Sequence, residues 1–281
     1  MIRYYNINGQ IVSASDAALK VNDLAILRGY GIFDYFLVRE GVPMFLDDYV
    51  SRFFNSAQLM KLDLAFSASE VKELIHELVE VNGVPEAGIR LVLTGGYADD
   101  GYTPEHPNLL ILEHPMPNIP SYENGAKVLL HGYQRELPEA KTINYVTGIR
   151  LNGEMKEKGC VEILYHDNGL IREAVRSNFF LVMPDDTVVT VGTEVLRGIT
   201  RKNVLTLARQ QFKVEERDIT LQELKTAKEA FITSTIKSVL PIVQVGDQVI
   251  GNGKVGAVTK QLGKSLEAFA KNYIEAAKVE I

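Results

Sequence analysis

One lysine, one acid and two short polar runs carry the chemistry that this sequence offers. The lysine, Lys141, lies in the stretch 139–145, where a predicted strand gives way to a predicted helix. The acid, Glu173, lies at the end of a later predicted strand. The runs are 198–201, at a predicted helix start, and 233–235, at a predicted strand end. A reactive amine, an acid and two places that attract anions are the parts of a site for a phosphorylated small molecule.

Lys141 and Glu173 have the residue types needed to hold pyridoxal phosphate (PLP). A lysine becomes an imine-forming nucleophile when burial and a neighbouring cation lower its pKa, and the same amine can later move a proton at the substrate α-carbon. A carboxylate keeps the pyridine nitrogen protonated, so that the ring can act as an electron sink, and Glu173 is the candidate. The spacing leaves open a second interpretation, a surface ion pair between Glu173 and Arg172.

Donors for a phosphate group occur at three places. The run 198–200 begins a predicted helix, where free backbone amides and the helix dipole attract a dianion, and the Thr200 hydroxyl adds a donor. Ser234 and Thr235 offer further donors at a strand end. Arg52, on a predicted amphipathic helix, could clamp phosphate with two nitrogens. An ordinary helix start, an ordinary strand end and a solvated arginine are the alternatives.

Composition excludes several classes of protein. The 281 residues carry a formal net charge of −6, which argues against a nucleic-acid-binding protein. The single cysteine, Cys160, allows no internal disulfide and suits a reducing cytoplasm. The sequence has no signal-peptide pattern and no apolar run of membrane-spanning length, so we expect a cytoplasmic protein without membrane contact. One cysteine and five histidines make a metal site improbable.

Periodicity and turn signals predict an α+β fold with two lobes. A hairpin turns at Asn8-Gly9, and a capping box at Ser67 and Glu70 begins a helix that ends before Gly83. Predicted helices span 47–62, 68–82, 146–158, 198–212 and 255–277. Predicted strands span 4–7, 10–13, 32–38, 42–45, 88–94, 108–113, 127–131, 160–165, 170–174, 179–183, 230–235 and 239–245. The proline-rich composition of 116–125 predicts a linker between a lobe at 1–115 and a lobe at 126–281.

In their order and spacing these motifs resemble the fold type IV PLP enzymes, which include branched-chain aminotransferases, D-amino-acid aminotransferases and aminodeoxychorismate lyases. The resemblance covers nearly the whole chain. Its motifs are Arg-Gly-Tyr-Gly-Ile-Phe-Asp at 28–34, Phe45 with Arg52 and Ser56-Ala57, Lys141, Glu173 with Ser177-Asn178, Leu-Arg-Gly-Ile-Thr-Arg at 196–201, Thr-Ser-Thr at 233–235 before Pro241, and Gly-Lys-Val-Gly at 253–256.

The resemblance implies a role for each matching residue. Lys141 would be the Schiff-base lysine and Glu173 the partner of the pyridine nitrogen. Leu196 would pack on one face of the ring and Tyr145 would lie near the ring hydroxyl. The phosphate ligands would be Arg52, Ile199, Thr200 and Thr235. The fold implied is a small N-terminal α/β lobe and a larger, β-rich C-terminal lobe with helices, in a homodimer whose pocket lies at the interface.

The substrate motifs depart from the familiar members of the family. Familiar D-amino-acid aminotransferases hold the substrate carboxylate with an Arg and a His on a loop near residues 95–104, but here that stretch has two acids and no base. His106, just beyond it, is typical of a solvated loop residue. Branched-chain enzymes use a tight Thr-Ala turn, and here Ile236 follows Thr235.

Two arginines inside the motifs could bind the carboxylate instead. Arg28 and Arg176 both lie in segments that the family directs at the cofactor, and a less familiar group of D-amino-acid aminotransferases uses an arginine pair in this way. The alternative is that Arg28 pairs with Asp99 or Asp100 and Arg176 with Asp34.

The sequence therefore predicts PLP-dependent transfer of an amino group, from D-amino acids to 2-oxoglutarate, with an amino acid and a keto acid as the small-molecule partners. A branched-chain L-amino-acid aminotransferase, with an apolar pocket lined by Phe33, Tyr97 and Tyr102, is the first competing interpretation. A lyase acting on aminodeoxychorismate and a catalytically silent PLP-binding protein are the remaining candidates.

Overall fold

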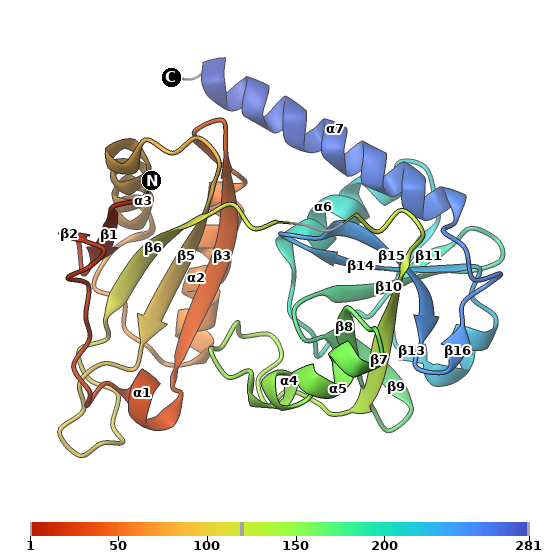
Figure 1. Cartoon of the computed structure of the whole chain (residues 1–281), viewed down its shortest axis with the longest axis horizontal. Helices are drawn as coiled ribbons and strands as arrows, with labels where there is room; N and C mark the ends of the chain where they lie inside the picture. Colours follow the sequence, from red (N-terminus) through yellow and green to blue (C-terminus); the bar gives the residue numbers. More distant parts are fainter. Residues whose placement is uncertain (1, 119–120, 280–281) are drawn as a thin grey trace. The chain divides into compact units, whose positions relative to one another are not determined.

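The chain forms two compact units (Figure 1). A computed structural model describes residues 2–118 and 121–279. The first unit comprises 2–118, 140–144 and 272–279, and the second comprises 121–139 and 145–271. The short segment that carries Lys141 therefore packs with the N-terminal residues, although it follows the predicted linker in sequence. Residues 119–120 of that linker lie outside the described residues, and the predicted boundaries between lobes stay a prediction.

The first unit is built on a six-stranded antiparallel sheet in the order β2-β1-β6-β5-β3-β4. Its hairpin turns at Asn8-Gly9, where both residues have positive φ, as the sequence predicts. The strands are β1 (Tyr4–Ile7), β2 (Gln10–Ser13), β3 (Gly31–Arg39), β4 (Val42–Pro43), β5 (Ala87–Thr94) and β6 (Leu109–Pro115).

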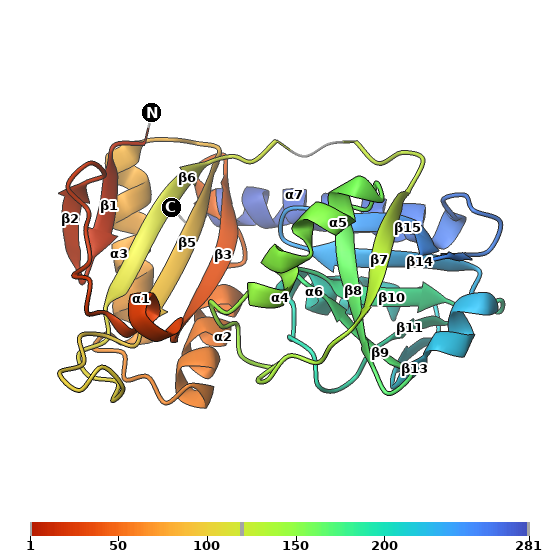
Figure 2. The ribbon, with the colours of Figure 1, turned by 60° about the horizontal axis from the view of Figure 1, so that its bottom comes forward.

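Two helices pack on this sheet (Figure 2). Helix α2 (Leu46–Leu59) contacts β3, and α3 (Ala68–Asn82) contacts β1 and β6. The predicted capping box of α3 is confirmed, with Ser67 and Glu70 bonded reciprocally, and Gly83 ends the helix in the left-handed conformation. A short helix that the sequence did not predict, α1 (Leu24–Arg28), has Asp23 as its N-cap and Gly29 as its C-cap.

The second unit is built on a ten-stranded mixed sheet in the order β12-β11-β10-β14-β15-β7-β8-β9-β13, with β16 paired to β15. Helix α6 (Ile199–Ala208) contacts β14 and packs on a core where Phe180 and Phe231 stack. The mixture of helices and sheets confirms the α+β prediction. The strands are β7 (Ala126–Gly132), β8 (Glu162–Asp167), β9 (Leu170–Ala174), β10 (Asn178–Val182), β11 (Val188–Thr190), β12 (Val214–Glu216), β13 (Ile219–Thr220), β14 (Glu229–Ser234), β15 (Ser238–Val245) and β16 (Gln248–Val249).

Several predicted elements differ from the structure. The helix predicted at 146–158 is two helices, α4 (Val146–Arg150) and α5 (Asn152–Glu157), because the Asn-Gly pair that opens α5 is a poor helix former. The helix predicted to reach residue 212 ends at Ala208. The strand predicted at 42–45 ends at Pro43, because Phe45 adopts a left-handed conformation before α2.

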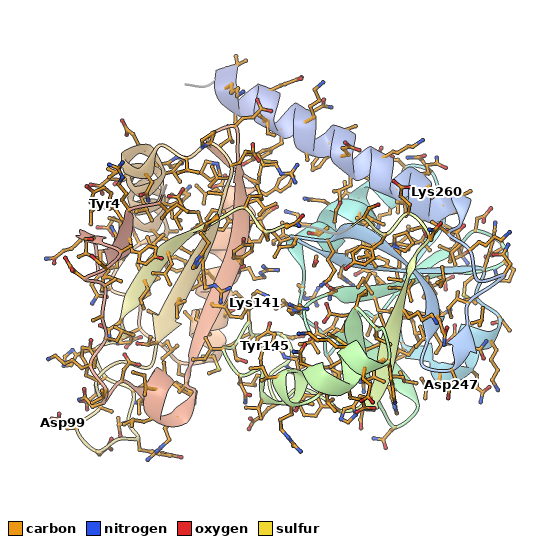
Figure 3. All side chains as sticks on the ribbon, viewed as in Figure 1. Tyr4, Asp99, Lys141, Tyr145, Asp247 and Lys260 are labelled. Atoms are coloured by element: carbon orange, nitrogen blue, oxygen red, sulfur yellow. The ribbon has the colours of Figure 1, made fainter. Side chains whose placement is uncertain are left out.

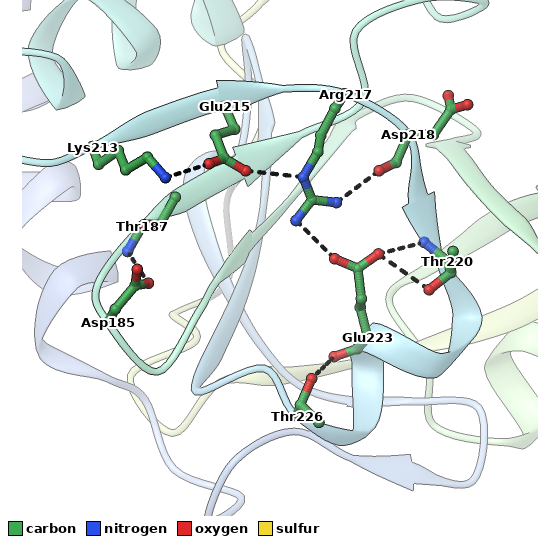
Figure 4. Close-up of polar contacts among 9 residues, drawn as sticks. All are labelled: Asp185, Thr187, Lys213, Glu215, Arg217, Asp218, Thr220, Glu223 and Thr226. Atoms are coloured by element: carbon green, nitrogen blue, oxygen red, sulfur yellow. Dashed lines mark hydrogen bonds and ion pairs between the residues drawn. The ribbon is translucent and has the colours of Figure 1, made fainter.

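Ion pairs support the short strands β12 and β13, which the sequence did not predict and which begin and end the strand order of the second sheet (Figure 4). Arg217 contacts Glu215, at 2.9 Å, and Glu223, at 2.8 Å, and Lys213 also pairs with Glu215, at 2.6 Å. Glu223 caps the 3-10 helix η1 (Leu221–Lys225) by accepting from the backbone and side chain of Thr220.

The C-terminal helix α7 (Ala257–Val279) begins on a buried acid of β14. Glu229 accepts hydrogen bonds from the backbone amides of Val258 and Thr259, which would otherwise lack partners. Farther along, Tyr273 packs on Phe45 of the first unit, with ring centroids 4.6 Å apart. Among the described residues, no helix is both long and apolar enough to cross a membrane.

Candidate active site

Backbone pairing fixes Lys141 against the first sheet (Figure 3). The Lys141 carbonyl accepts from the Phe33 amide at 2.9 Å, and the Lys141 amide donates to Ser56 Oγ at 3.2 Å. The neighbouring Thr142 forms a β-bridge with Ile32, so the segment 140–144 lies along the start of β3. The Lys141 ammonium lies 4.7 Å from the centre of the Phe33 ring. The predicted catalytic lysine and the predicted substrate residue Phe33 are therefore neighbours.

Arg52 is a nearly buried member of an ion pair. Its side chain is only 9% exposed, and it donates from Nε and Nη2 to the two carboxylate oxygens of Asp34, at 2.9 and 2.6 Å. The ring of Tyr49 lies beside the guanidinium, 5.2 Å from its central carbon. The alternative prediction for Arg52, a solvated arginine on a surface helix, is wrong.

Glu173 is buried and held on both carboxylate oxygens. Arg135 Nη1 donates to Oε1 at 3.0 Å, and the backbone amide of Leu196 donates to Oε2 at 3.0 Å. Hydrogen bonds from a guanidinium and an amide stabilise the ionised form of a buried carboxyl group. The alternative pairing of Glu173 with Arg172 is wrong, because Arg172 pairs with Glu194 instead, at 2.9 Å.

The segment before α6 brings Leu196 and the helix start next to Glu173. Asn178 donates from Nδ2 to the Leu196 carbonyl at 2.7 Å and so fixes this segment to β10. Gly198 is the N-cap of α6 and has no side chain with which to cap the helix. A Cβ at Gly198 would lie 2.2 Å from Asn178 Oδ1, so the close approach requires glycine. Ile199 and Thr200 occupy the first turn, whose amides attract an anion.

The predicted residues Ser234, Thr235 and Tyr145 also belong to the second unit. Ser234 ends β14, and its hydroxyl accepts from the Lys237 amide at 3.1 Å, while Thr235 begins the turn to β15. Tyr145 is half-buried and directly precedes α4.

The two arginines predicted to bind substrate are both exposed. Arg28 ends α1 and donates to the Leu27 carbonyl at 3.0 Å, and its Nη2 lies beside Gly101 of the 95–104 loop. Arg176, 59% exposed, lies 3.6 Å from Glu162. The alternative pairing of Arg176 with Asp34 is wrong, because Asp34 holds Arg52.

The 95–104 loop is organised by its own acid. Asp100 accepts from the amides of Tyr102 and Thr103 and from the Thr103 hydroxyl, and these bonds hold its pKa at about 2. The Asp100 carboxylate therefore bonds to Tyr102 and Thr103, and not to Arg28 as the alternative prediction had it. Tyr102 is 78% exposed and Tyr97 is half-buried, and His106 is exposed as predicted.

Within each unit the structure brings several predicted residues together: Lys141 with Phe33 in the first, and Glu173 with Leu196 and the start of α6 in the second. Sequence reasoning missed Arg135 as the partner of Glu173 and Asp34 as the partner of Arg52. Neither pairing has a local sequence signal, because 38 residues separate Arg135 from Glu173 and 18 separate Asp34 from Arg52.

These residues fit PLP. A lysine held by its backbone, a buried carboxylate stabilised in its charged form, and an uncapped helix start with a required glycine match an aldehyde, a pyridine nitrogen and a phosphate. No cluster of His, Cys, Asp or Glu suited to a metal ion occurs in the described part of the chain.

Comparison with known proteins gives the same assignment. Residues 31–245 match the family model of amino-transferase class IV. A putative branched-chain-amino-acid aminotransferase of Methanocaldococcus jannaschii is 31% identical over 268 residues, which cover 91% of this chain and 92% of that protein. A D-alanine aminotransferase of Bacillus licheniformis is 30% identical over 273 residues, covering 92% and 94%.

Solved structures share the fold. A branched-chain amino acid aminotransferase from T.th., complexed with N-(5'-phosphopyridoxyl)-L-glutamate, superposes with a TM-score of 0.87 at 24% identity, covering 98% of this chain and 94% of that one. The branched-chain enzyme of Escherichia coli gives a TM-score of 0.86 at 24% identity, covering 95% and 93%. The chain has the fold type IV architecture and belongs to the class IV aminotransferases, which are PLP-dependent enzymes.

Proposed function

We propose that this aminotransferase acts on D-amino acids and uses 2-oxoglutarate as the amino acceptor. The amino donor leaves as its 2-oxo acid, and 2-oxoglutarate leaves as glutamate, so the donor loses an amino group and its α-hydrogen and gains an oxo oxygen, while the acceptor undergoes the reverse change. PLP, when bound, supplies the electron sink that makes the α-hydrogen acidic. The protein supplies binding, orientation and the proton-moving amine.

The cofactor roles follow from the local environments of the residues. Lys141 carries the cofactor and moves the proton at the α-carbon, and its backbone bonds to Phe33 and Ser56 support this role because they fix its position. Glu173 holds the proton of the pyridine nitrogen.

The phosphate and ring contacts come from several elements. Arg52 donates to phosphate from its guanidinium, while Leu196 packs on the ring and Tyr145 lies near the ring hydroxyl. The other phosphate ligands are the Ile199 and Thr200 amides, the Thr200 hydroxyl, Ser234 and Thr235.

The environment of Arg176 supports its role as a carboxylate ligand. Its neighbour Glu162 is buried, and Lys237 already neutralises that acid through a contact of 2.6 Å, to which Ser177 adds a hydrogen bond. The 3.6 Å separation of Arg176 Nε from Glu162 is a looser contact. Because Lys237 serves as the close counterion, the exposed guanidinium of Arg176 can bind a substrate anion.

The contacts of Arg28, in the first unit, also support a role as a carboxylate ligand. Its guanidinium donates only to a neutral carbonyl among the interactions found in the described residues, so no acid competes with a substrate carboxylate. The loop beside it has two acids and no basic side chain. This combination favours the pair Arg28 and Arg176 as the carboxylate clamp, with Phe33 beside the substrate.

A branched-chain L-amino-acid aminotransferase is the competing candidate, because the relative from M. jannaschii carries that putative name at 31% identity. Exposed Tyr102 makes a poor lining for an apolar pocket in the single chain.

We also propose, from the family resemblance, that the enzyme is a cytoplasmic homodimer whose partner loop closes the pocket.

The amino-donor preference is read from a half-reaction. The holoenzyme is mixed separately with D-alanine, D-glutamate, L-leucine and L-glutamate, and the visible absorbance band of the bound cofactor is followed. We expect the D-isomers to bleach the band and the L-isomers to leave it. Bleaching by L-leucine and L-glutamate alone would make this a branched-chain enzyme, and pyruvate release from aminodeoxychorismate without an acceptor would make it a lyase.

The clamp predicts the effect of removing either arginine. Arg28→Ala and Arg176→Ala should each raise the KM for the amino donor about 10- to 100-fold, because each loses charged hydrogen bonds to the substrate carboxylate. Steady-state kinetics of the purified variants checks this. Arg39→Ala, at an exposed site on β3, is the control and should leave KM unchanged. An unaltered KM in both arginine variants would rule out the clamp.

The close approach of Asn178 to Gly198 at the start of α6 predicts that a methyl group added at Gly198 weakens cofactor binding. Gly198→Ala should weaken PLP binding about 10- to 100-fold, because the new Cβ displaces either Asn178 or the amides that face the phosphate. Titration of cofactor-depleted protein with PLP measures the change. Gly153→Ala, where a Cβ meets nothing within 4 Å, is the matched control. Equal affinity in the two variants would exclude a phosphate site at this helix start.

A further inference from the structure

The Asp34–Arg52 pair is a deeply buried two-point ion pair that includes a proposed cofactor ligand. Asp34, on β3, has a fully buried carboxylate, and Arg52, on α2, is nearly buried as well. Both residues belong to the first unit, so their geometry is fixed within one packed body. The Asp34 carboxylate also accepts from the Tyr35 amide at 2.7 Å, so its own position is set by the strand.

This pairing fixes the direction of the guanidinium. Of the five N–H groups of Arg52, those that point at Asp34 are on Nε and Nη2. A planar fork bound at two points cannot rotate, and the Tyr49 ring beside it restricts the plane further. The two-point bond thereby also fixes the direction of the remaining N–H groups, chiefly those of Nη1.

The same pairing reduces the net charge at the phosphate ligand. Asp34 offsets the charge of Arg52, so the pair attracts a dianion less strongly than an unpaired arginine does. Removal of the carboxylate charge therefore has two opposite effects on phosphate binding. It increases the local positive charge, and it releases the guanidinium from its fixed orientation.

We propose that Asp34 is a positioning residue for the cofactor phosphate: it orients Arg52 so that the edge of the guanidinium away from Asp34 meets the phosphate oxygens. Orientation outweighs the loss of net charge, because charged hydrogen bonds depend on the alignment of donor and acceptor. This inference rests on the role of Arg52 proposed above.

The test compares PLP with pyridoxal, which lacks the phosphate. Full-length protein freed of cofactor is titrated with each compound, and the ratio of the two dissociation constants gives the contribution of the phosphate. Asp34→Asn should weaken PLP binding about 10- to 100-fold and leave pyridoxal binding within about threefold, so the preference for PLP falls. Arg52→Ala should lower the preference at least as much.

Two further variants separate positioning from general stability. Asp47→Asn makes the same chemical change at an exposed site of α2, where Asp47 pairs with Lys72, and should leave the preference unchanged. Arg52→Lys keeps the charge but cannot bind Asp34 at two points, so it should lower the preference as Asp34→Asn does. Because Arg52→Lys keeps a charged partner for buried Asp34, it provides the same test if Asp34→Asn does not fold.

The results with these variants distinguish failure of the positioning role of Asp34 from failure of the phosphate role of Arg52. An unchanged or increased preference for PLP in Asp34→Asn, or an unchanged preference in Arg52→Lys, would overturn the positioning role of Asp34. If Arg52→Ala also kept the preference, the proposed phosphate role of Arg52 would fail, and the inference with it. A loss in Arg52→Ala without a loss in Asp34→Asn would remove the inference alone and leave the proposed cofactor role intact.

Discussion

The backbone bonds between the segment 140–144 and the start of β3 are the constraint on which the site depends. They hold Lys141, the proposed catalytic lysine, by its main chain, through the Phe33 amide and the Ser56 hydroxyl, so the long side chain alone remains to be positioned. A nucleophile that must meet a fixed aldehyde gains from such restraint, because less freedom is lost in the reaction. The same strand carries Asp34, so β3 sets both the lysine segment and the proposed phosphate arginine.

Paired burial of charge is the second feature of the site. Arg52 is matched by Asp34, Glu173 by Arg135, and Glu162 by Lys237. A buried charge without a partner is strongly unfavourable, so each pair holds its two members against one another in a fixed geometry. Arg28 and Arg176, in contrast, are exposed. This division agrees with the proposed roles, in which buried residues hold the cofactor and exposed arginines bind a substrate carboxylate that enters and leaves.

Local patterns predicted the local features. The Ser67–Glu70 capping box and the Asn8-Gly9 turn depend on neighbouring residues, and both are confirmed. The pairing of Lys141 with Phe33 and that of Glu173 with Arg135 depend on contacts between distant segments, which periodicity does not encode. The short strands β11 to β13 were missed because two or three residues give no pattern. The order of motifs nevertheless identified the family, since chemistry restricts those residues more than local structure does.

The most direct test of the account is to find which lysine carries the cofactor. The holoenzyme is reduced with borohydride, digested, and analysed by mass spectrometry, with an unreduced sample as the control. The account predicts that a phosphopyridoxyl group is attached to the peptide containing Lys141 and to no other. Attachment at another lysine, such as the half-buried Lys237, or the absence of any adduct on a protein that binds PLP, would contradict it.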